Sequence, residues 1–224
     1  MGRVVRTDIG GYVYHVLNRG NARGAIFHSE KDYVAFEEIL SAAVDKYQMR
    51  LVAYCLMPNH FHLVLYPERD GQIRMFMQWL TLTHTQRYHA QTKTAGYGHL
   101  YQGRYKSFIV ENDSHVWTLL TYVEKNPIRA KLVSSPIDWK WSSYYKRHFG
   151  TTEQKKQLAT DSVTWHENYA QLFERTEDAG ELISIRNSIN RGTPYGGTSW
   201  LETILQKFPL GTTVNKRGRP KKGT

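Results

Sequence analysis

The segment from Arg50 to Tyr66 constrains the fold of this chain more than any other feature. Arg50 to Met57 is an apolar run of strand length, Pro58-Asn59 interrupts it, and His60 to Tyr66 is a second run of similar length. Two such runs joined by a short break are typical of a β-hairpin. Residues 50–66 are therefore predicted to form two antiparallel strands.

The flanking segments predict further strands and helices. Segments rich in β-forming side chains predict strands, and apolar residues that recur close to every 3.6 positions predict helices. Ser29 is a plausible helix cap with Asp32 at the capping-box position, and Pro127 ends a later helix. The predicted elements are, in chain order, a strand over 11–17, a helix that begins after Ser29, the hairpin over 50–66, a helix over 72–90, a strand over 105–110 and a helix from about 114 to 126.

This order of elements predicts an α+β fold, in which a ferredoxin-like antiparallel sheet carries helices on one face. The length of 224 residues suits one sizeable domain with an extension. We expect a main domain over residues 1–150, a helical extension over residues 151–210 and a basic, disordered tail over residues 211–224. An aromatic cluster within residues 139–145 is expected to pack on the sheet domain.

The charge of the chain favours a polyanionic partner. The formal net charge is +10, and it is uneven: residues 1–150 carry +7, residues 151–190 carry −3 and residues 211–224 carry +5. Nucleic acid is the most common partner of such a basic chain. No long apolar run supports a membrane partner, and the N-terminal residues have no apolar signal core. We therefore expect a cytoplasmic protein associated with the nucleoid.

Two histidines stand out in the second strand of the predicted hairpin. Residues two apart in a strand share a face, so His60 and His62 point the same way, whereas Phe61 points toward the helices. Two adjacent imidazoles can bind one divalent cation, although two solvated surface histidines would produce the same pattern. The single cysteine, Cys55, cannot build a thiolate zinc site alone. Val64 occupies the position where a histidine-triad hydrolase needs a third histidine.

The helix predicted over 114–126 offers a chemical partner for the histidines. Tyr122 and Asn126 are four residues apart and share a helix face. If that face packs beside the histidine strand, Tyr122 comes near a bound metal and the amide oxygen of Asn126 becomes a possible ligand. A tyrosine phenolate can attack a phosphodiester when a metal polarises the phosphate. A packed core tyrosine is the alternative for Tyr122.

Four segments together resemble one family. The sequence is similar to the REP-associated tyrosine transposases, a branch of the single-tyrosine HUH transposases. The segments that carry the resemblance are Tyr14-His15-Val16-Leu17-Asn18-Arg19-Gly20, Met57-Pro58-Asn59-His60-Phe61-His62-Leu63-Val64, Gly98-His99-Leu100-Tyr101-Gln102-Gly103-Arg104-Tyr105-Lys106-Ser107 and Tyr122-Val123-Glu124-Lys125-Asn126-Pro127-Ile128-Arg129-Ala130. They span roughly residues 10–150 in order, and the stretch from Asn187 to Gly197 is similar less sharply.

The resemblance implies roles for the residues named above. It implies that His60 and His62 bind Mg²⁺ or Mn²⁺ and that Tyr122 is the nucleophile, which forms a 5′-phosphotyrosine and frees a 3′-OH. Asn126 stands where related insertion-sequence enzymes carry glutamine, so its reach toward the metal is one methylene shorter. The implied substrate is single-stranded DNA that folds into REP-type palindromic hairpins, cleaved next to a short tetranucleotide. A site completed within one chain, and hence a monomer, is expected, with a dimer as the alternative.

Basic and aromatic side chains outside this site are candidates for DNA contacts. Tyr101 and Tyr105 could stack on unpaired bases. The tail resembles an AT-hook, an extended arm that fits a narrow minor groove. The residues predicted to contact DNA phosphates or grooves are Arg19, Arg23, Arg104, Lys106, Lys216, Arg217, Arg219, Lys221 and Lys222.

Two other functions remain open from the sequence. The chain could be a non-catalytic hairpin-binding protein on the same fold, although Tyr122 and both histidines are present. A plasmid-type replication initiator or relaxase shares the histidine pair, but the local motifs match the transposase branch. The sequence does not reveal the target repeat, the preferred metal or the oligomeric state.

Overall fold

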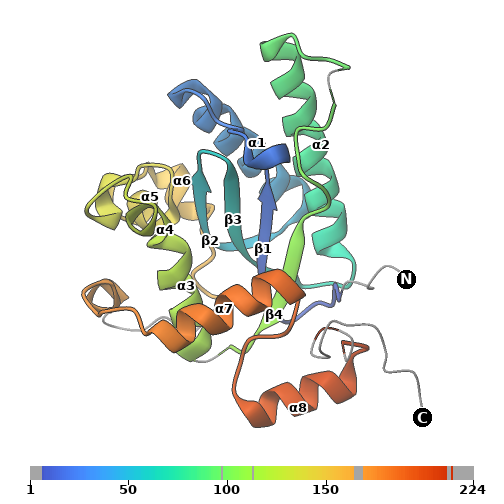
Figure 1. Ribbon diagram of the computed structural model, residues 1–224, viewed down its shortest axis with the longest axis vertical. Coiled ribbons are helices and arrows are strands. Elements are labelled where there is room, and N and C mark those ends of the chain that lie inside the picture. Colours follow the sequence, from blue (N-terminus) through green and yellow to red (C-terminus); the bar gives the residue numbers. More distant parts are fainter. Residues whose placement is uncertain (1–6, 97, 113, 164–168, 211–212, 214–224) are drawn as a thin grey trace, which may run out of the picture.

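A four-stranded antiparallel sheet forms the centre of the protein, in the order β2-β3-β1-β4 (Figure 1). The computed structural model describes residues 7–96, 98–112, 114–163, 169–210 and 213. The strands and the helices that cover the sheet are β1 (Val13–Arg19), α1 (Glu30–Tyr47), β2 (Arg50–Met57), β3 (His60–Tyr66), α2 (Gln72–Thr92), β4 (Lys106–Val110) and α3 (Ser114–Glu124). The shorter and later helical elements are η1 (Asn21–Arg23), α4 (Asn126–Arg129), η2 (Pro136–Asp138), α5 (Ser143–Phe149), α6 (Thr152–Lys156), η3 (Tyr169–Phe173), α7 (Ala179–Arg191) and α8 (Thr198–Lys207). The predicted α+β class with an antiparallel sheet is confirmed.

The predicted hairpin of residues 50–66 is present as β2 and β3. In its register, His62 pairs with Cys55 on one side and with Leu17 of β1 on the other. The turn is held against the segment after β1, since the backbone carbonyl of Asn59 accepts a hydrogen bond from the Gly20 amide at 2.8 Å. The hairpin is therefore fixed on both sides, which sets the position of every side chain on β3.

One face of the sheet is covered by α1 and α2, as expected. Phe61 on β3 is fully buried, and its ring lies 5.0 Å from that of Phe36 on α1. Ser29 is the N-cap of α1 and Asp32 completes the capping box, as predicted, because the Asp32 carboxylate accepts a hydrogen bond from the backbone N–H of Ser29 at 2.8 Å. The odd-numbered apolar residues of β3 thus face these two helices.

The other face, which carries the two histidines, is covered as well, by α3 and α7 (Figure 1). Val116, Leu119 and Val123 of α3 are buried there, and Ile185 of α7 is fully buried beside them. Helices were expected on one face of the sheet, and α1 and α2 do cover one face; α3 and α7 cover the other face in addition. The helix predicted to carry the nucleophile packs on the opposite face, because its own apolar stripe also needs burial.

Segments after residue 150 lie against both edges of the sheet. Leu158 forms a parallel bridge with Leu51 of β2, and Tyr195 forms one with Val110 of β4. The amide of Tyr195 donates to the carbonyl of Ile109 at 2.9 Å. C-terminal helices are present as expected, whereas the predicted basic tail lies outside the described residues. Among the helices described, none is both long and apolar enough to cross a membrane.

The predicted aromatic cluster packs on the sheet domain, as expected. The indole N–H of Trp139 donates to the carbonyl of Leu56 at 2.9 Å. Trp141 is buried, with its ring stacked on Tyr33 at 4.7 Å. These contacts close the end of the hairpin near the histidines.

Candidate active site

One cavity brings together the residues that the sequence singled out for chemistry. It has a volume of about 340 Å³ and lies between β1, β3, the α3–α4 junction and α7. The predicted site residues at its wall are His60, His62, Tyr122, Asn126 and Arg19. The side chains that complete the wall are Leu17, Met57, Arg129, Ala130, Arg186, Ile189 and Asn190.

The two histidines share a face of β3, with ring centroids 5.0 Å apart. Nδ1 of His60 lies 2.6 Å from the amide oxygen of Asn59, and Nδ1 of His62 lies 2.8 Å from Nε2 of His15. Since the oxygen of Asn59 can only accept, His60 carries its proton on Nδ1. If His62 likewise donates from Nδ1 to His15, both Nε2 atoms keep their lone pairs for a ligand, the usual arrangement around metal-binding histidines.

Burial keeps the three imidazoles neutral. Desolvation lowers the pKa of His15 to about 3 and that of His60 to about 4, and it lowers the pKa of His62 well below its ordinary value. The positive charge of Arg19 lowers the pKa of His60 and His62 further, and that of Arg129 lowers the pKa of His62. At neutral pH these rings are therefore in the form that can coordinate a metal.

Tyr122 lies across the cavity from the histidines. It is buried on α3, and its ring centroid is 6.1 Å from that of His62 in an edge-on arrangement. The guanidinium of Arg129 lies over the Tyr122 ring at 4.3 Å and donates to the Tyr122 backbone carbonyl. Arg129 also pairs with Glu177, so the tyrosine ring is held between the sheet and an anchored cation.

Asn126 lies at a break in the helix. α3 ends at Glu124, and the short helix α4 begins at Asn126, because Pro127 cannot donate a helical hydrogen bond. The Asn126 amide N–H₂ donates to the carbonyls of Tyr122 at 3.1 Å and Val123 at 3.2 Å. With the nitrogen turned toward the helix, the amide oxygen is the atom left for the cavity.

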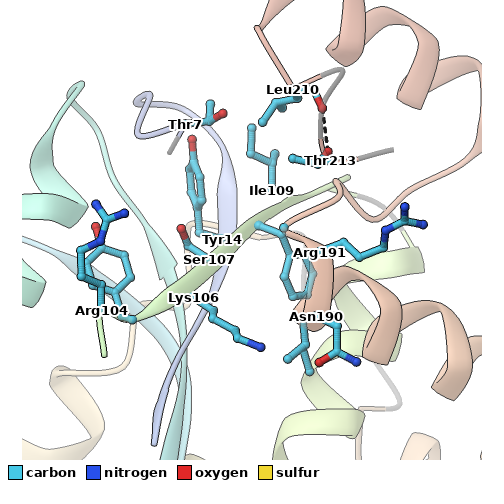
Figure 2. A pocket seen from close by; sticks show the side chains of 14 residues that line it. Thr7, Tyr14, Arg104, Lys106, Ser107, Ile109, Asn190, Arg191, Leu210 and Thr213 are labelled. Atoms are coloured by element: carbon cyan, nitrogen blue, oxygen red, sulfur yellow. Dashed lines mark hydrogen bonds between the residues drawn. The ribbon is translucent and has the colours of Figure 1, made fainter. Parts of the chain in front are cut away.

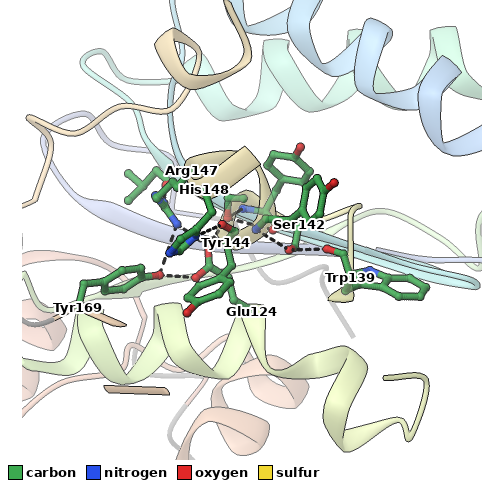
Figure 3. A network of polar contacts seen from close by, with 11 residues as sticks. Glu124, Trp139, Ser142, Tyr144, Arg147, His148 and Tyr169 are labelled. Atoms are coloured by element: carbon green, nitrogen blue, oxygen red, sulfur yellow. Dashed lines mark hydrogen bonds and ion pairs between the residues drawn. The ribbon is translucent and has the colours of Figure 1, made fainter. Parts of the chain in front are cut away.

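A buried ionic network anchors the end of α3 (Figure 3). Glu124 is fully buried, and its carboxylate accepts hydrogen bonds from Arg147 at 2.5 Å and from the hydroxyls of Ser143 and Tyr169. Arg147 in turn donates to the carbonyl of Val52 on β2. Glu124 is two residues from Tyr122, so this network ties the helix that carries the tyrosine to the sheet.

The charge of the cavity is strongly positive. Arg19, Arg129 and Arg186 line it, and no carboxylate is found among the described residues of its wall. Arg186 is close enough to lower the pKa of Arg129 by repulsion, although burial is the larger cause. The Nε atom of Arg19 is buried without a hydrogen-bond partner among the described residues. Such a concentration of cations is suited to an anionic ligand such as a phosphate.

The other predicted DNA-binding residues lie apart from this cavity. Arg23 is exposed in η1, and its backbone carbonyl accepts a hydrogen bond from the Asn59 side chain at 3.0 Å. Arg104 and Lys106 are exposed at the wall of a second cavity, beside the start of β4 (Figure 2). The predictions for Lys216, Arg217, Arg219, Lys221 and Lys222 fall outside the described residues.

The expectation that Tyr101 stacks on a base is wrong. Tyr101 is buried, and its hydroxyl lies 2.6 Å from Nδ1 of the buried His84. Its ring also packs edge-on against Phe61. The Tyr101 ring is therefore part of the hydrophobic core. Tyr105 is also buried, but it lines the second cavity.

The donor set fits a hard divalent cation better than a closed zinc site. The described residues contain no group of three or more His, Cys, Asp or Glu side chains that could hold a metal. Two imidazole nitrogens and one amide oxygen leave positions for water and phosphate oxygens, which Mg²⁺ and Mn²⁺ accept. His60, His62 and Asn126 are thus the residues that would hold such an ion.

Sequence reasoning missed several residues of this site. His15, Arg129, Arg186 and Asn190 have no role in the chemistry inferred from residue patterns. Only Arg129 had a local signal, because it is seven residues after Tyr122 and so close to two helical turns away. The others reach the site from β1 and α7, which no sequence spacing connects to the histidines.

Comparisons with known proteins agree with this architecture. The family model described as Transposase IS200 like matches residues 9–126. A REP-associated tyrosine transposase from Haemophilus influenzae is 23% identical over 124 residues, which are 51% of this chain and 70% of that protein. The solved structure of a REP-associated tyrosine transposase bound to a REP hairpin superimposes with a TM-score of 0.56 at 16% identity. That match covers 74% of this chain and 95% of the other.

The matched region contains every strand of the sheet, the histidine pair and Tyr122. The chain belongs to the IS200-like transposase family. Within that class it is distantly related to the REP-associated tyrosine transposases. α7 and α8 lie beyond the residues that the family model matches.

Proposed function

We propose that this protein cleaves and rejoins single-stranded DNA at REP-type hairpin repeats through a covalent phosphotyrosine on Tyr122. The main support is the position of Tyr122, whose ring lies 6.1 Å from that of His62 in a cavity lined by cations. A nucleophile, a pair of metal-binding imidazoles and a phosphate-attracting field are the parts that such a reaction needs.

The chemistry follows from the groups around the cavity. A bound Mg²⁺ or Mn²⁺ would polarise the scissile phosphate. The hydroxyl of Tyr122 loses its proton to solvent as its oxygen attacks phosphorus, the bond from phosphorus to the 3′ oxygen breaks, and the leaving oxygen takes a proton to become a free 3′-OH. The fragment on the 3′ side of the break stays on Tyr122, joined through its 5′ phosphate as a phosphotyrosine. Attack by another 3′-OH reverses these bond changes and rejoins the strand.

The arginines contribute binding and orientation. Arg19 and Arg186 stand at the cavity wall, where they can pair with the phosphate oxygens. Arg129 holds the Tyr122 ring through its contacts with the ring and with the backbone carbonyl. This division of roles leaves the histidines and Asn126 for the metal.

A hairpin substrate is supported by the relatives. The related solved structure is described as bound to a REP hairpin. This chain shares its fold and itself carries a net charge of +10. Arg23, Arg104 and Lys106 are exposed around the sheet and can contact hairpin phosphates. The sequence adds five basic residues over 216–222, which we propose as further phosphate contacts. The proposed partner is therefore DNA, in a nucleoid-associated protein.

The whole candidate site comes from one chain. His60, His62, Tyr122 and Asn126 line the same cavity without any contribution from a second copy. This arrangement supports action as a monomer.

A denaturing gel tests the proposal directly. The protein is incubated with a 5′-labelled and, separately, a 3′-labelled REP-type hairpin in Mg²⁺ or Mn²⁺. We expect a protein–DNA adduct that carries the 3′ label only, because the 5′ phosphate of the downstream fragment is the one that joins Tyr122. Tyr122→Phe removes the nucleophilic oxygen and should abolish the adduct.

Matched variants separate this function from a purely binding role. Tyr88→Phe removes a hydroxyl on α2, outside the cleavage cavity and the cavity beside β4, and should leave the adduct unchanged. Hairpin binding without any adduct from the wild-type protein in either metal would favour the non-catalytic alternative. Undiminished cleavage by Tyr122→Phe would exclude Tyr122 as the nucleophile.

A further inference from the structure

A second cavity lies beside the candidate active site, between the start of β4 and the end of α7 (Figure 2). Its volume is about 340 Å³, and its wall includes Arg104, Lys106, Ser107 and Arg191. Figure 2 shows Lys106 extending from β4 toward Asn190 of α7. A volume near 300 Å³ is at the small end of ligand sites, so it suits one nucleotide rather than a duplex.

The two cavities share a wall. Ile189 and Asn190, in the last turn of α7, line both the cavity that holds Tyr122 and the cavity beside β4. A DNA strand whose phosphate sits beside Tyr122 can therefore continue past the end of α7 into the second cavity.

The charge pattern singles out these two cavities. The wall beside β4 contains Arg104, Lys106 and Arg191 and, among the described residues, no carboxylate. The neighbouring cavity behind α3 has nearly the same volume, about 330 Å³, but three carboxylates line it, those of Glu177, Asp178 and Glu181. That cavity also contains Lys125 and Arg175, the cavity against α1 contains Glu37 and Glu38, and the cavity beside residues 193–196 contains Glu181 together with Arg191. Of these five cavities, the first pair alone has cations and no carboxylate among the described residues of the wall, which favours a polyanion there.

The floor of the second cavity is apolar and rigid. Tyr14, Tyr105 and Ile109 line it and are buried. The hydroxyl of Tyr14 donates a hydrogen bond to the backbone carbonyl of Ile9 at 3.1 Å, which fixes the ring. Ser107 and Asn190 add polar groups at the rim. An apolar floor with a few polar groups and a cationic entrance matches the needs of one base and its phosphate.

We infer that the cavity between β4 and the end of α7 is a subsite for one unpaired nucleotide of the single-stranded flank next to the scissile phosphate. This inference rests on the proposed function, since the flank exists only in a hairpin substrate with single-stranded ends. It assigns α7, which lies outside the residues matched by the family model, to substrate recognition.

An abasic scan tests the subsite. The protein carrying Tyr122→Phe, which prevents turnover, is titrated with REP-type hairpins that carry six nucleotides of single strand on each side. Each flank nucleotide is replaced in turn by an abasic analogue, and Kd is measured by fluorescence anisotropy. We expect one position near the cleaved linkage to weaken binding by about 5- to 100-fold, because loss of a stacked base has an effect of this size.

Variants at the cavity connect that position to the structure. Ser107→Phe fills the cavity from β4 and should remove the sensitivity at that one position, so that intact and abasic flanks bind equally. Arg104→Ala changes an exposed side chain and so tests the entrance without risk to the fold; it should weaken binding of flanked hairpins more than of hairpins without flanks. Arg87→Ala, an exposed site on α2 paired with Glu38, is the matched control and should leave both unchanged.

The outcomes separate the subsite from the proposed function. If the protein binds hairpins and forms the adduct but no flank position is sensitive to base removal, the subsite alone is overturned. The subsite is also overturned if a folded Ser107→Phe protein keeps the sensitive position and Arg104→Ala weakens the binding of flanked and unflanked hairpins equally. Failure of the wild-type protein to bind or cleave any hairpin would overturn the proposed function itself.

Discussion

Nε2 of His15 lies 2.8 Å from Nδ1 of His62, and both rings are buried on the same face of the sheet. β1 and β3 are antiparallel neighbours, and Leu17 of β1 pairs with His62. His15 therefore lies diagonally across the strand pair from His62. There Nε2 of His15 can accept a hydrogen bond from the Nδ1–H of His62, which turns Nε2 of His62 toward the cavity. This contact joins a residue of unassigned role to the proposed metal site.

His15 is predicted to control metal affinity without touching the metal. His15→Leu removes the acceptor for the N–H of His62 and should weaken Mn²⁺ affinity by about 10- to 100-fold, the usual effect of losing such a partner. His15→Gln keeps an acceptor and should restore much of the affinity. Isothermal titration with Mn²⁺ measures the difference, and equal affinities of wild type and His15→Leu would contradict this role.

Arg129 is predicted to position Tyr122 rather than to bind DNA. Arg129→Ala frees the ring that the guanidinium now covers at 4.3 Å, and adduct formation should slow by about 100-fold because the nucleophile is misplaced. Hairpin Kd should change much less. Arg129→Lys retains the charge but not the planar guanidinium, so the hairpin Kd should stay close to that of the wild type while the rate of adduct formation stays low. A loss of Kd as large as the loss of rate would indicate a direct DNA contact instead.

The Glu124 network is predicted to contribute strongly to stability (Figure 3). Glu124→Gln leaves the guanidinium of Arg147 without its charged partner in a buried position, which should lower the free energy of unfolding by about 3 kcal/mol. Urea unfolding followed by circular dichroism gives the value. Glu30→Gln, which breaks an exposed ion pair with Lys140, is the control and should cost less than about 1 kcal/mol. Equal effects of the two changes would argue against the network.

His84 is predicted to make the protein less stable in mild acid. Burial lowers the pKa of His84 to about 4, whereas an unfolded chain has a value near 6.5. As pH falls below about 6.5 the unfolded state binds the proton and the native state does not. The free energy of unfolding should therefore drop, by about 2 kcal/mol at pH 5 relative to pH 8 from this residue.

The contribution of His84 can be isolated by difference, because His15 and His60 act in the same direction. His84→Gln keeps an acceptor for the hydroxyl of Tyr101, which now lies 2.6 Å from Nδ1. Denaturation curves from pH 8 to pH 5 should show a shallower loss in His84→Gln than in wild type. Parallel losses in the two proteins would rule out His84 as a source.

The basic tail is predicted to add electrostatic affinity for DNA. A chain truncated after residue 210 loses the five cations at positions 216–222, so it should bind a hairpin more weakly and with a flatter dependence on salt. Kd measured between about 50 and 200 mM salt tests this. The same affinity and salt slope in both proteins would show that the tail does not contact DNA.

Local sequence signals determined the elements and half of the candidate site. The two apolar runs of residues 50–66 predicted the hairpin, and the period of two along a strand put His60 and His62 on one face. Helical spacing likewise placed Tyr122 and Asn126 together. These inferences succeeded because side-chain direction within one element depends only on its local geometry.

Tertiary structure decided everything that joins one element to another. It covered the histidine face with α3 and α7 and placed Tyr101 in the core. It also brought Arg129 and Arg186 to the cavity and His15 into contact with His62. The sequence could not show these contacts, because the positions of β1 and α7 depend on how several apolar faces are buried at once. The placement of the histidine pair on one face was determined by a single strand. The neutral form of these rings, their orientation and the arginines around them were decided by the packing of the whole chain.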